Sequence, residues 1–470
     1  METRSLKFVA EACGGEIRHG SPETAVAGVC IDSRQAARGD VFFAIRGGRF
    51  DGHDFLDEAA GKGVAAVVIE RAAGGTRKAA WREADWKSRH GGCAVVMVDA
   101  TRAALGRLAA CYRRQFDLPV ICVCGSNGKT TTKELIASSL CAKLETLRSE
   151  ASFNNDIGVP LSLLRLSASH RAAVLEAGAN HPGELAPLLE MIRPKIGVLT
   201  NIGREHMEFF GDLAGVAREE GRLAEQLPED GMLFVNGDDE WTEKIIGRTR
   251  AKVVRCGLGR ANDWRAEGIR LEKSGTRFRA FGPDRIGPEE YRIPLLGRHQ
   301  VVNALFAVAV SEELGLGRSA IRDGLAACQP PKMRLQLWES NGIRILDDAY
   351  NANADSAIAA LETLCELPLE GRRVAVLGDM EELGPHSEAA HAEAGRRAAE
   401  LKIGQLFAVG KMARVTGRSA REAGLARVME FEDVESAMIA VKRFLKAGDV
   451  VLLKASRAAR LERMGGALKD

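Results

Sequence analysis

Short, almost wholly apolar runs alternate with amphipathic segments along much of the chain. In the middle of the sequence the apolar runs are Val120–Cys124, Ala173–Leu175, Ile196–Thr200 and Met232–Val235. The segments between them have the periodicity of helices, and they are Thr130–Leu144, Gly183–Met191 and Leu213–Gln226. Strands that are apolar on both faces and separated by helices are typical of a parallel sheet covered on both sides. The pattern therefore predicts an α/β fold.

The same alternation occurs on either side of this central block. Before it, the predicted strands are Val41–Ile45, Val64–Ile69 and Ala94–Val98, with helices at Asp54–Ala60 and Thr101–Phe116. After it, the predicted strands are Ile343–Leu346, Arg373–Leu377, Gln405–Val409 and Val450–Leu453. Between the two, Val253–Pro294 has the short, charged strands of an antiparallel flap, and Val301–Leu314 is compatible with a helix.

These blocks predict three α/β domains. Residues 1–105 form a small α/β N-terminal domain. Residues 106–330 form a central domain with a phosphate loop and a mostly parallel sheet that has helices on both faces. Residues 331–470 form a C-terminal Rossmann-like α/β domain that begins at the Pro330-Pro331 pair. With 470 residues, 46% of them hydrophobic, the chain is large enough for a core in each domain.

Charge and cysteine content exclude several classes of function. Lys and Arg number 66 against 64 Asp and Glu, a net charge of +2, which offers no electrostatic case for nucleic acid or an anionic membrane as the main partner. No run approaches the roughly 18 apolar residues of a membrane span, and the start lacks a signal-peptide pattern. Ten cysteines without a Cys-x-x-Cys pair indicate a reducing compartment and no structural zinc. We therefore expect a cytoplasmic protein.

The clearest chemical motif follows the strand Val120–Cys124. It is a glycine-containing loop that opens a helix, and its candidate nucleotide-binding residues are Gly125, Ser126, Asn127, Gly128, Lys129, Thr130 and Thr131. Backbone N–H groups of such a loop hold polyphosphate, the lysine adds a positive charge, and the first threonine hydroxyl can hold Mg²⁺. Val123 stands where the usual motif has its first glycine, and an ordinary strand-to-helix turn is the alternative. Because phosphate loops serve kinases, GTPases, motors and ligases alike, the loop predicts only nucleotide binding.

Two further side chains follow neighbouring predicted strands. Glu176 ends the strand that starts at Ala172, and His206 follows the strand Ile196–Thr200. Ligands of open α/β sheets bind at the carboxyl ends of the strands, so a carboxylate and an imidazole there can complete the coordination of one or two Mg²⁺ ions. A solvated edge carboxylate and a hydrogen-bonded loop histidine are the alternatives.

Several motifs occur in an order that resembles the ATP-dependent Mur ligase family of peptidoglycan precursor synthesis. They are the 125–130 loop, Asn154–Gly158, Glu176–Gly183, Asn201–His206, Gly297–Asn303 and Asp347–Asn353, with Asp32–Arg34 and Asp51–Phe55 in the first block. Within the family, Gly378–Gly384 and Asp348–Asn353 resemble the member that adds D-alanyl-D-alanine to UDP-N-acetylmuramoyl-tripeptide. The Asp-Asn-Pro-Arg motif of the diaminopimelate-adding relative is absent from the sequence.

The resemblance implies a reaction and a division of labour. ATP would phosphorylate the terminal carboxylate of the tripeptide, and the amine of D-alanyl-D-alanine would attack the acyl phosphate. The first domain would bind the UDP substrate, the central domain ATP and two Mg²⁺ ions, and the third domain the incoming amine while closing the site. Thr130 and Glu176 would hold the first ion and His206 the second. We expect a monomer with small-molecule substrates and neither a nucleic-acid partner nor insertion into a membrane.

The resemblance also assigns individual residues. Lys129, Glu176, His206 and Arg334 would be catalytic. The ATP would also contact Asn303 at the adenine, Arg334 at the phosphates, and Asp348, Tyr350 and Asn351 at the ribose and base. The substrates would contact Ser33, Arg34, Asp51, Gly52, His53, Asn154, Asn155, Lys454, Ser456 and Arg457. Ala455 replaces a glycine that the family carries in this last turn, which makes a left-handed backbone there less favourable.

One departure from the family concerns the second metal. Several relatives carry a carbamylated lysine on the helix after the histidine motif, and the aligned position here is Glu220. We hypothesise that this carboxylate replaces the carbamate, directly or through a water. The alternative is a solvated helix acid among Arg218, Glu219 and Arg222, because runs of charge usually face water.

Other functions remain open from the sequence. They are a ligase of the same family that adds a different amino acid, a folylpolyglutamate-synthetase-like enzyme, a nucleotide-driven switch ATPase and a non-catalytic scaffold. A switch would hydrolyse ATP without an amine, whereas a ligase would release phosphate only with both substrates. The sequence does not distinguish lysine from diaminopimelate as the third residue of the peptide.

Overall fold

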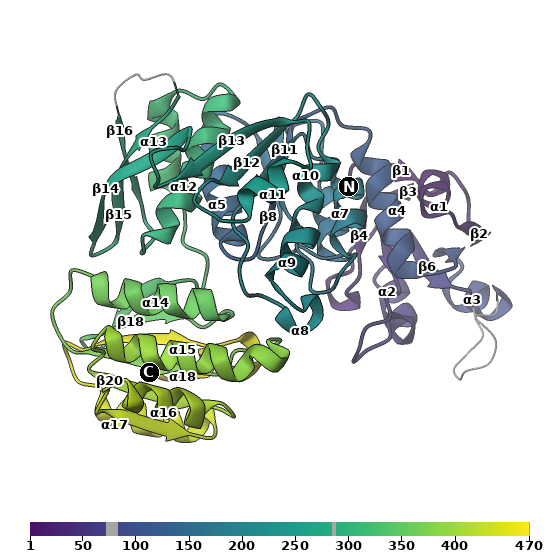
Figure 1. Cartoon of the computed structure of the whole chain (residues 1–470). Helices are drawn as coiled ribbons and strands as arrows, with labels where there is room; N and C mark the ends of the chain where they lie inside the picture. Colours follow the sequence, from purple (N-terminus) through teal and green to yellow (C-terminus); the bar gives the residue numbers. More distant parts are fainter. Residues whose placement is uncertain (72–82, 284–287, 470) are drawn as a thin grey trace. The chain divides into compact units, whose positions relative to one another are not determined.

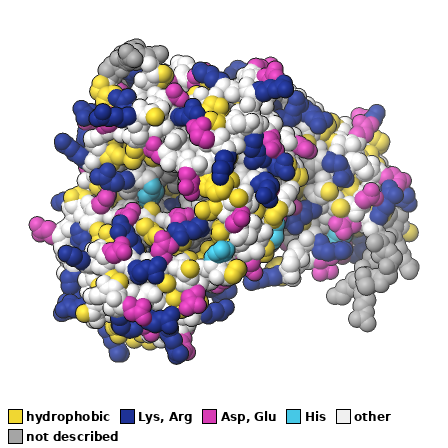
Figure 2. Space-filling view, in the orientation of Figure 1, with side chains coloured by type: hydrophobic (Ala, Val, Ile, Leu, Met, Phe, Trp, Pro, Cys, Tyr) yellow, Lys and Arg dark blue, Asp and Glu magenta, His cyan; other side chains and the backbone are white. Residues whose placement is uncertain are grey.

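The computed structural model describes residues 1–71, 83–283 and 288–469 and has an α/β architecture (Figure 1). Its contacts divide the chain into two compact units. The first comprises Met1–Cys122, Glu145–Ala177 and Ala186–Pro194, and the second comprises Val123–Leu144, Gly178–Leu185 and Lys195–Asp470. Acidic and basic side chains are interspersed over the face seen in Figure 2, in keeping with the net charge of +2.

A five-stranded sheet with the order β2-β7-β6-β5-β4 lies in the N-terminal part of the first unit. Its strands are β2 (Glu16–His19), β4 (Gly28–Cys30), β5 (Asp40–Phe43), β6 (Ala66–Glu70) and β7 (Ala94–Val98). All neighbours pair in parallel except β2 with β7. The short strands β1 (Arg4–Ser5) and β3 (Ala25–Val26) form a separate antiparallel pair. The helices are α1 (Leu6–Cys13), α2 (Leu56–Gly61), α3 (Glu83–His90) and α4 (Thr101–Arg113).

The predicted strands of this part are confirmed with small shifts at their ends. Strand β5 stops at Phe43 instead of Ile45, because the Ile45 N–H turns back to the carbonyl of Phe43 at 2.9 Å. The core under the sheet includes Phe42, Val67 and Trp86, all nearly inaccessible to water.

The central sheet has nine strands in the hydrogen-bonded order β16-β15-β14-β13-β12-β11-β8-β10-β9. They are β8 (Val120–Cys124), β9 (Thr146–Arg148), β10 (Ala172–Glu176), β11 (Ile196–Leu199), β12 (Met232–Asn236), β13 (Lys252–Gly257), β14 (Trp264–Glu272), β15 (Gly275–Phe281) and β16 (Glu289–Ile293). The expectation that the antiparallel flap starts at Val253 is wrong at its beginning. Strand β13 pairs in parallel with β12, its Val254 and Cys256 are buried, and only β14, β15 and β16 are antiparallel to one another. Residues 284–287 of the flap lie outside the described residues.

The helices associated with these strands follow the predicted pattern. They are α5 (Lys129–Leu140), α6 (Gly158–Leu163), α7 (Leu185–Ile192), α8 (Met207–Phe210), α9 (Leu213–Glu220), α10 (Arg222–Gln226), α11 (Thr242–Ile246), α12 (His299–Glu313) and α13 (Arg318–Ala326). The single helix expected over Leu213–Gln226 is in fact α9 and α10, divided at Gly221. A Cβ at Gly221 would lie 2.0 Å from Nη1 of Arg248, so the Arg248 side chain occupies the space beside the break.

The C-terminal sheet has the order β17-β18-β22-β19-β20-β21. Its strands are β17 (Gln336–Ser340), β18 (Ile343–Asp348), β19 (Arg373–Leu377), β20 (Gln405–Val409), β21 (Val428–Phe431) and β22 (Val450–Lys454), and only β17 runs antiparallel to its neighbour. The helices are α14 (Ala354–Glu366), α15 (Ser387–Glu400), α16 (Ala413–Glu422), α17 (Val434–Phe444) and α18 (Glu462–Ala467). Successive strand residues pack into two different cores, such as Leu452 into one and Leu453 into the other. The sheet is therefore covered on both faces, as predicted.

Among the described residues, no helix has both the length and the apolarity that crossing a bilayer requires.

Phe407 is a test of the C-terminal core. Its side chain is inaccessible to water and contacts the rings of Phe431 and Phe444 at centroid distances of 6.1 and 5.4 Å. We predict that Phe407→Ala lowers the free energy of unfolding by about 3–5 kcal/mol, because it removes buried apolar surface and leaves a cavity. Denaturant titration measures this loss, and Ile439→Ala, at a residue that is 54% exposed, should change stability far less. Equal effects of the two substitutions would contradict the packing described here.

Candidate active site

The phosphate loop (residues 125–130) connects β8 to α5 and depends on two glycines. Gly125 and Gly128 have φ values of +113° and +85°, in the region that other residues rarely adopt. A Cβ on Gly125 would lie 2.3 Å from Oγ1 of Thr200, and one on Gly128 would lie 2.7 Å from Oδ1 of Asn303. Helix α5 begins directly at Lys129, so its first backbone N–H groups face the loop, as polyphosphate binding requires.

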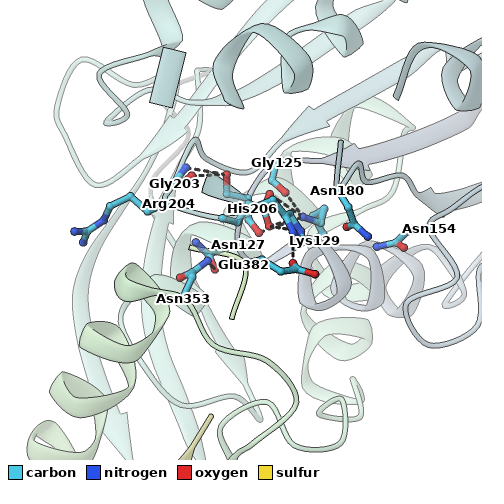
Figure 3. A network of polar contacts seen from close by, with 12 residues as sticks. Gly125, Asn127, Lys129, Asn154, Asn180, Gly203, Arg204, His206, Asn353 and Glu382 are labelled. Atoms are coloured by element: carbon cyan, nitrogen blue, oxygen red, sulfur yellow. Dashed lines mark hydrogen bonds and ion pairs between the residues drawn. The ribbon is translucent and has the colours of Figure 1, made fainter. Parts of the chain in front are cut away.

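A second loop, residues 201–206 after β11, holds the phosphate loop (Figure 3). The backbone N–H of Asn127 donates to Oδ1 of Asn201 at 3.1 Å, and Nδ2 of Asn201 donates to the carbonyl of Asn127 at 2.9 Å. The N–H of Gly203 donates to Oγ of Ser126 at 2.8 Å, and that hydroxyl lies 3.2 Å from the Gly203 carbonyl. The conformation of the phosphate loop is thus determined by its neighbour as well as by its own glycines.

The side chain of Lys129 meets a carboxylate from the 201–206 loop. Its Nζ lies 3.3 Å from both oxygens of Glu205 and also donates to the carbonyl of Ser126 at 3.1 Å. Burial raises the pKa of Glu205 above its ordinary value, although the adjacent Lys129 and His206 act in the opposite direction. Glu205 therefore orients the ammonium group that the sequence assigns to phosphate binding.

His206 is oriented by a carboxylate from the C-terminal part of the second unit. Its backbone is left-handed, with φ 50°, and Nδ1 contacts Oε2 of Glu382, which lies in the turn after β19. This contact holds the pKa of Glu382 below its ordinary value. Because a carboxylate only accepts hydrogen bonds, Nδ1 carries the proton, and Nε2 is left as the nitrogen that can bind a metal.

Glu176, in the first unit, offers an oxygen suited to a cation. Its side chain is 1% exposed, and Oε1 accepts a hydrogen bond from Nδ2 of Asn154 at 2.9 Å. Within the described part of the chain, Oε2 is buried without a hydrogen-bond partner. Such an oxygen is costly unless an ion or ligand satisfies it, so the residue fits the predicted Mg²⁺. The neighbouring Asn155 instead accepts the N–H groups of Ile157 and Gly158 at the start of α6.

Glu220 is not the solvated acid that the sequence allowed as an alternative. It is 2% exposed, and its Oε2 accepts the backbone N–H of Gly125 at 2.6 Å. Burial raises its pKa to about 7. Glu219 is also buried, and it accepts the N–H groups of Gly183 at 3.0 Å and Leu185 at 2.9 Å. The end of α9 therefore anchors two loops, and the contact that Glu220 makes is with the first residue of the phosphate loop.

Arg334 and Tyr350, both predicted to contact ATP, lie together. The guanidinium of Arg334 lies 4.2 Å from the centre of the Tyr350 ring. The residues on either side of the arginine, Met333 and Leu335, have φ values of 56° and 51°. This unusual turn is held by hydrogen bonds from the N–H of Tyr350 to the Met333 carbonyl and from the N–H of Leu335 to Oδ1 of Asp348.

Lys454 and Ser456 contact protein groups. Nζ of Lys454 lies 2.6 Å from Oδ2 of Asp348 and donates to the Asn351 carbonyl at 2.8 Å. The hydroxyl of Ser456 donates to the Ala352 carbonyl at 3.1 Å and accepts the N–H of Glu381 at 2.9 Å. Both side chains thereby order the loops at the carboxyl edge of the C-terminal sheet.

Arg457 and Ala455, the other residues of the 454–457 turn, do not have the loop-ordering role of Lys454 and Ser456. Arg457 is exposed, its side chain 60% accessible to water. The backbone of Ala455 is not left-handed, so the glycine that the family carries is not needed for the backbone here.

Asn303 lies inside α12, one turn after its start, where Nδ2 donates to Oε1 of Gln300 at 2.9 Å and Oδ1 lies beside Gly128.

The predicted UDP-binding residues follow two parallel strands of the first unit. Ser33 and Arg34 come after β4, and Asp51, Gly52 and His53 come after β5. Arg34 is paired with Asp32 at 2.7 Å and is largely exposed. His53 contacts Asp51 through Nδ1 at 2.7 Å, and its Nε2 accepts the N–H of Glu70 at 3.1 Å. The carboxyl ends of parallel neighbours lie at one edge of a sheet, so both groups belong to the same edge.

Sequence reasoning missed several residues of this site. Glu205 and Asn201 stand in the same motif as His206, and Glu382 stands in the Gly378–Gly384 motif, so the motifs already contained them. Their roles depend on partners that are far away in the sequence. Arg204 and Asn353 likewise stand in the Asn201–His206 and Asp347–Asn353 motifs. Asp355 and Glu393 stand in none of the motifs, although the structure joins them to the same loops.

The site combines a glycine-dependent phosphate loop, a lysine at the start of the following helix and buried carboxylates beside strand ends. An α/β protein with these features is a nucleotide-binding protein of the phosphate-loop class. Three family models match the chain: "Mur ligase family, catalytic domain" over residues 25–113, "Mur ligase middle domain" over 123–311 and "Mur ligase, glutamate ligase domain" over 333–457. The chain belongs to the Mur ligase family.

Individual relatives match over nearly the whole length. The UDP-N-acetylmuramoyl-tripeptide--D-alanyl-D-alanine ligase of Escherichia coli (strain K12) is 35% identical, with 99% of this chain and 98% of the relative covered. The crystal structure of MurF from Acinetobacter baumannii superposes with a TM-score of 0.88 at 31% identity, covering 100% and 99% of the two chains. MurF ligase from Thermotoga maritima in complex with ADP has a TM-score of 0.78 at 28% identity, covering 94% and 96%.

Two substitutions of Glu220 distinguish the role of its hydrogen bond to Gly125 from the role of its negative charge. We predict that Glu220→Ala weakens ADP binding about tenfold, because it removes a hydrogen bond that holds the phosphate loop. Glu220→Gln keeps an acceptor for the Gly125 N–H and should retain ADP affinity within about twofold. Calorimetric titration measures both, and Glu225→Ala, on the next helix, is the matched control.

The same variants test the metal hypothesis for Glu220. If its charge serves Mg²⁺, Glu220→Gln requires more Mg²⁺ for half-maximal activity while its ADP affinity is unchanged. Full ligase activity and unchanged Mg²⁺ dependence of Glu220→Ala would show that the residue has neither role.

His391 gives a pH-dependent contribution to stability. Its Nε2 accepts the N–H of Met380 at 2.9 Å, Nδ1 donates to the Ser387 carbonyl at 2.7 Å, and burial lowers its pKa below 6.5. The unfolded chain takes up a proton below about pH 6.5 and the folded chain resists it, so stability falls as the pH falls through this range. We predict that wild type loses up to about 1.4 kcal/mol per pH unit more than His391→Gln in denaturant titrations below pH 6.5. His386→Gln, at an exposed position, should keep the wild-type slope, and an unchanged slope in His391→Gln would be the contrary result.

Proposed function

We propose that the protein is an ATP-dependent ligase that adds D-alanyl-D-alanine to UDP-N-acetylmuramoyl-tripeptide and forms the UDP-N-acetylmuramoyl-pentapeptide used in peptidoglycan synthesis. ATP is converted to ADP and phosphate, and the product bond is an amide. The observation that carries the proposal is the 35% identity, over almost the full length of both chains, to a ligase with this name. The phosphate loop with Lys129, Glu176 at the end of β10 and His206 in the loop after β11 support it.

The electrostatics of the site suit the reaction. The tripeptide carboxylate must attack the γ-phosphorus of ATP, so two anions have to approach each other. In this proposal the phosphate-loop amides and Lys129 hold the phosphates, and Arg334 adds a permanent positive charge. The resulting acyl phosphate is attacked by the amine of the dipeptide, and phosphate leaves with one oxygen of the original carboxylate.

The residues proposed for Mg²⁺ are Thr130, Glu176, His206 and Glu220, with two ions expected. Two observations support this set: Oε2 of Glu176 is buried without a hydrogen-bond partner among the described residues, and Glu382 orients His206. Bound Mg²⁺ would neutralise charge on the phosphate and carboxylate oxygens. The chain itself supplies oxygen and imidazole ligands, of which Glu176, Glu220 and His206 are already oriented by hydrogen bonds.

The nucleotide contacts proposed beyond the phosphate loop are Asn303, Arg334, Asp348, Tyr350 and Asn351. Asn303 already lies against Gly128, which supports a place at the nucleotide. Tyr350 and Arg334 form one stacked group, so they would act together. Asp348 is paired with Lys454, and any contact with the ribose would have to share that carboxylate.

The substrate contacts remain assigned to the first and third proposed domains. Ser33, Arg34, Asp51, Gly52 and His53 in residues 1–105 would receive the UDP portion. Asn154, which donates a hydrogen bond to Glu176, and the neighbouring Asn155 would face the peptide. Lys454, Ser456 and Arg457 would belong to the amine site, the first two by ordering its loops. We further propose a cytoplasmic monomer, with domain boundaries near residues 105 and 331.

The test is phosphate release with ATP, Mg²⁺ and UDP-N-acetylmuramoyl-tripeptide while the amine is varied. We predict release with D-alanyl-D-alanine, and at least about a hundredfold less with diaminopimelate, lysine or D-glutamate, because a misoriented amine forfeits the advantage of proximity. Tripeptides ending in lysine and in diaminopimelate are compared in parallel. Activity with diaminopimelate as the amine but not with the dipeptide would identify a different ligase, and release without any amine would identify a switch ATPase.

Lys129→Ala serves as the inactive reference in this assay, since it removes the charge beside the phosphates. Lys143→Ala, an exposed lysine after the same helix, is the matched control and should be fully active.

A further inference from the structure

Arg204 joins the 201–206 loop to two helices of the C-terminal part of the second unit. Its backbone N–H donates to Oδ2 of Asp355 at 2.7 Å, and its Nε and Nη2 donate to Oδ1 of the same carboxylate at 2.8 and 2.5 Å. Its Nη1 contacts Oε2 of Glu393 at 2.5 Å. Asp355 lies in the first turn of α14, and Glu393 lies on α15. One arginine thus binds carboxylates from two helices.

The backbone beside Arg204 is shaped for this docking. A Cβ on Gly203 would lie 2.9 Å from Oδ2 of Asp355 and 3.0 Å from Nδ2 of Asn127, so glycine allows both to approach. Asn353, the N-cap of α14, donates from Nδ2 to Oδ1 of Asn127 at 3.0 Å. The start of α14 therefore contacts the phosphate loop as well as the 201–206 loop.

The two residues after Arg204 contact side chains of the candidate active site. Glu205 contacts Lys129, and His206 contacts Glu382. In Figure 3, Arg204 extends away from Lys129 and His206, so it takes no part in their contacts itself. A shift of Arg204 would move the two side chains that follow it in the chain.

These contacts connect segments that belong to different parts of the family architecture. Arg204 lies in residues 123–311, matched by the middle-domain model, and Asp355, Glu382 and Glu393 lie in residues 333–457, matched by the glutamate ligase domain model. The arginine is therefore placed to make the geometry of the ATP-binding loops depend on the docking of the C-terminal domain.

We propose that Arg204 is a positioning residue for ligation. Its ion pairs with Asp355 and Glu393 hold the 201–206 loop so that Glu205 orients Lys129 and His206 presents Nε2. The proposal rests on the proposed function. The ion pairs are about one-third exposed, and pairs of this kind add little to overall stability. Two guanidinium N–H groups converge on Oδ1 of Asp355, and the guanidinium also meets both oxygens of Glu393. Such multiple contacts fix orientation, which is what a transfer between two bound substrates requires.

The experiment compares Arg204→Ala, Arg204→Lys and a matched control, Arg397→Ala, in the full chain. Arg397 lies on α15 and links it to α14 through Glu362, with a second contact to Glu400 of its own helix and the same degree of exposure as Arg204. Among the described residues, its ion pairs do not include the 201–206 loop. Steady-state kinetics gives kcat and the KM for ATP, denaturant titration gives stability, and hydrogen exchange reports the backbone of residues 201–206.

We expect Arg204→Ala to lower kcat at least about tenfold, with the stability of the Arg397→Ala control. Hydrogen exchange at residues 201–206 should be faster in Arg204→Ala and unchanged in Arg397→Ala. Arg204→Lys should recover only part of the rate, because lysine lacks the planar fork. In the double variant Arg204→Ala/Asp355→Asn the second substitution should add less than about a twofold loss, because the guanidinium partner of residue 355 is already gone and asparagine still offers an oxygen to the backbone N–H of residue 204.

Wild-type kcat and loop exchange in Arg204→Ala would overturn the proposal, and so would equal losses in Arg204→Ala and Arg397→Ala. These outcomes differ from failure of the proposed function, in which wild type and Arg397→Ala would themselves form no amide product. The hydrogen-exchange result does not depend on activity and decides the structural claim by itself.

Discussion

The hydrogen bonds that hold the phosphate loop are the constraint on which the rest of the site depends. Gly125 is fixed by the Glu220 carboxylate, Ser126 by Gly203, and Asn127 by Asn201. A loop whose N–H groups must surround polyphosphate cannot satisfy itself with its own side chains, so its shape comes from neighbouring segments. The glycines at 125 and 128 permit this shape, and α9 and the 201–206 loop maintain it.

The second unit uses carboxylates to orient basic groups throughout this region. Glu205 faces Lys129, Glu382 faces His206, Asp348 faces Lys454, and Asp355 faces Arg204. Each pair sets the direction of a side chain that would otherwise have several rotamers. An enzyme that must bring a carboxylate and a triphosphate together benefits from cations that are already oriented before the substrates arrive.

Much of the fold followed from the apolar pattern. Strands such as Val120–Cys124 and Arg373–Leu377 occur where they were predicted, because a short run that is apolar on both faces can be buried only inside a covered sheet. The direction of β13 could not be predicted, since the period of a strand does not reveal which neighbour it pairs with. The local pattern also does not reveal that the side chain of Arg248 fills the space beside Gly221, where the helix divides.

In the candidate site too, local motifs predicted some residues, whereas contacts between distant parts of the sequence could not be predicted. Motifs indicated Lys129, Glu176 and His206 because their residue types suit phosphate and metal chemistry. The contact of Glu220 with Gly125, and the pairing of Lys454 with Asp348, depend on partners about a hundred residues away. No local pattern specifies such pairs. Runs of charged residues usually face water. Glu219 and Glu220 are instead buried, because they accept hydrogen bonds from backbone N–H groups.

In the proposed reaction, ATP activates the tripeptide carboxylate as an acyl phosphate before the amide forms. The most direct test labels that terminal carboxylate with ¹⁸O and follows the label through a complete turnover with D-alanyl-D-alanine. Mass spectrometry of the released phosphate should find one ¹⁸O atom per amide formed, because the bridging oxygen leaves with the phosphate. Phosphate that carries no label beyond that supplied by solvent would exclude an acyl phosphate intermediate.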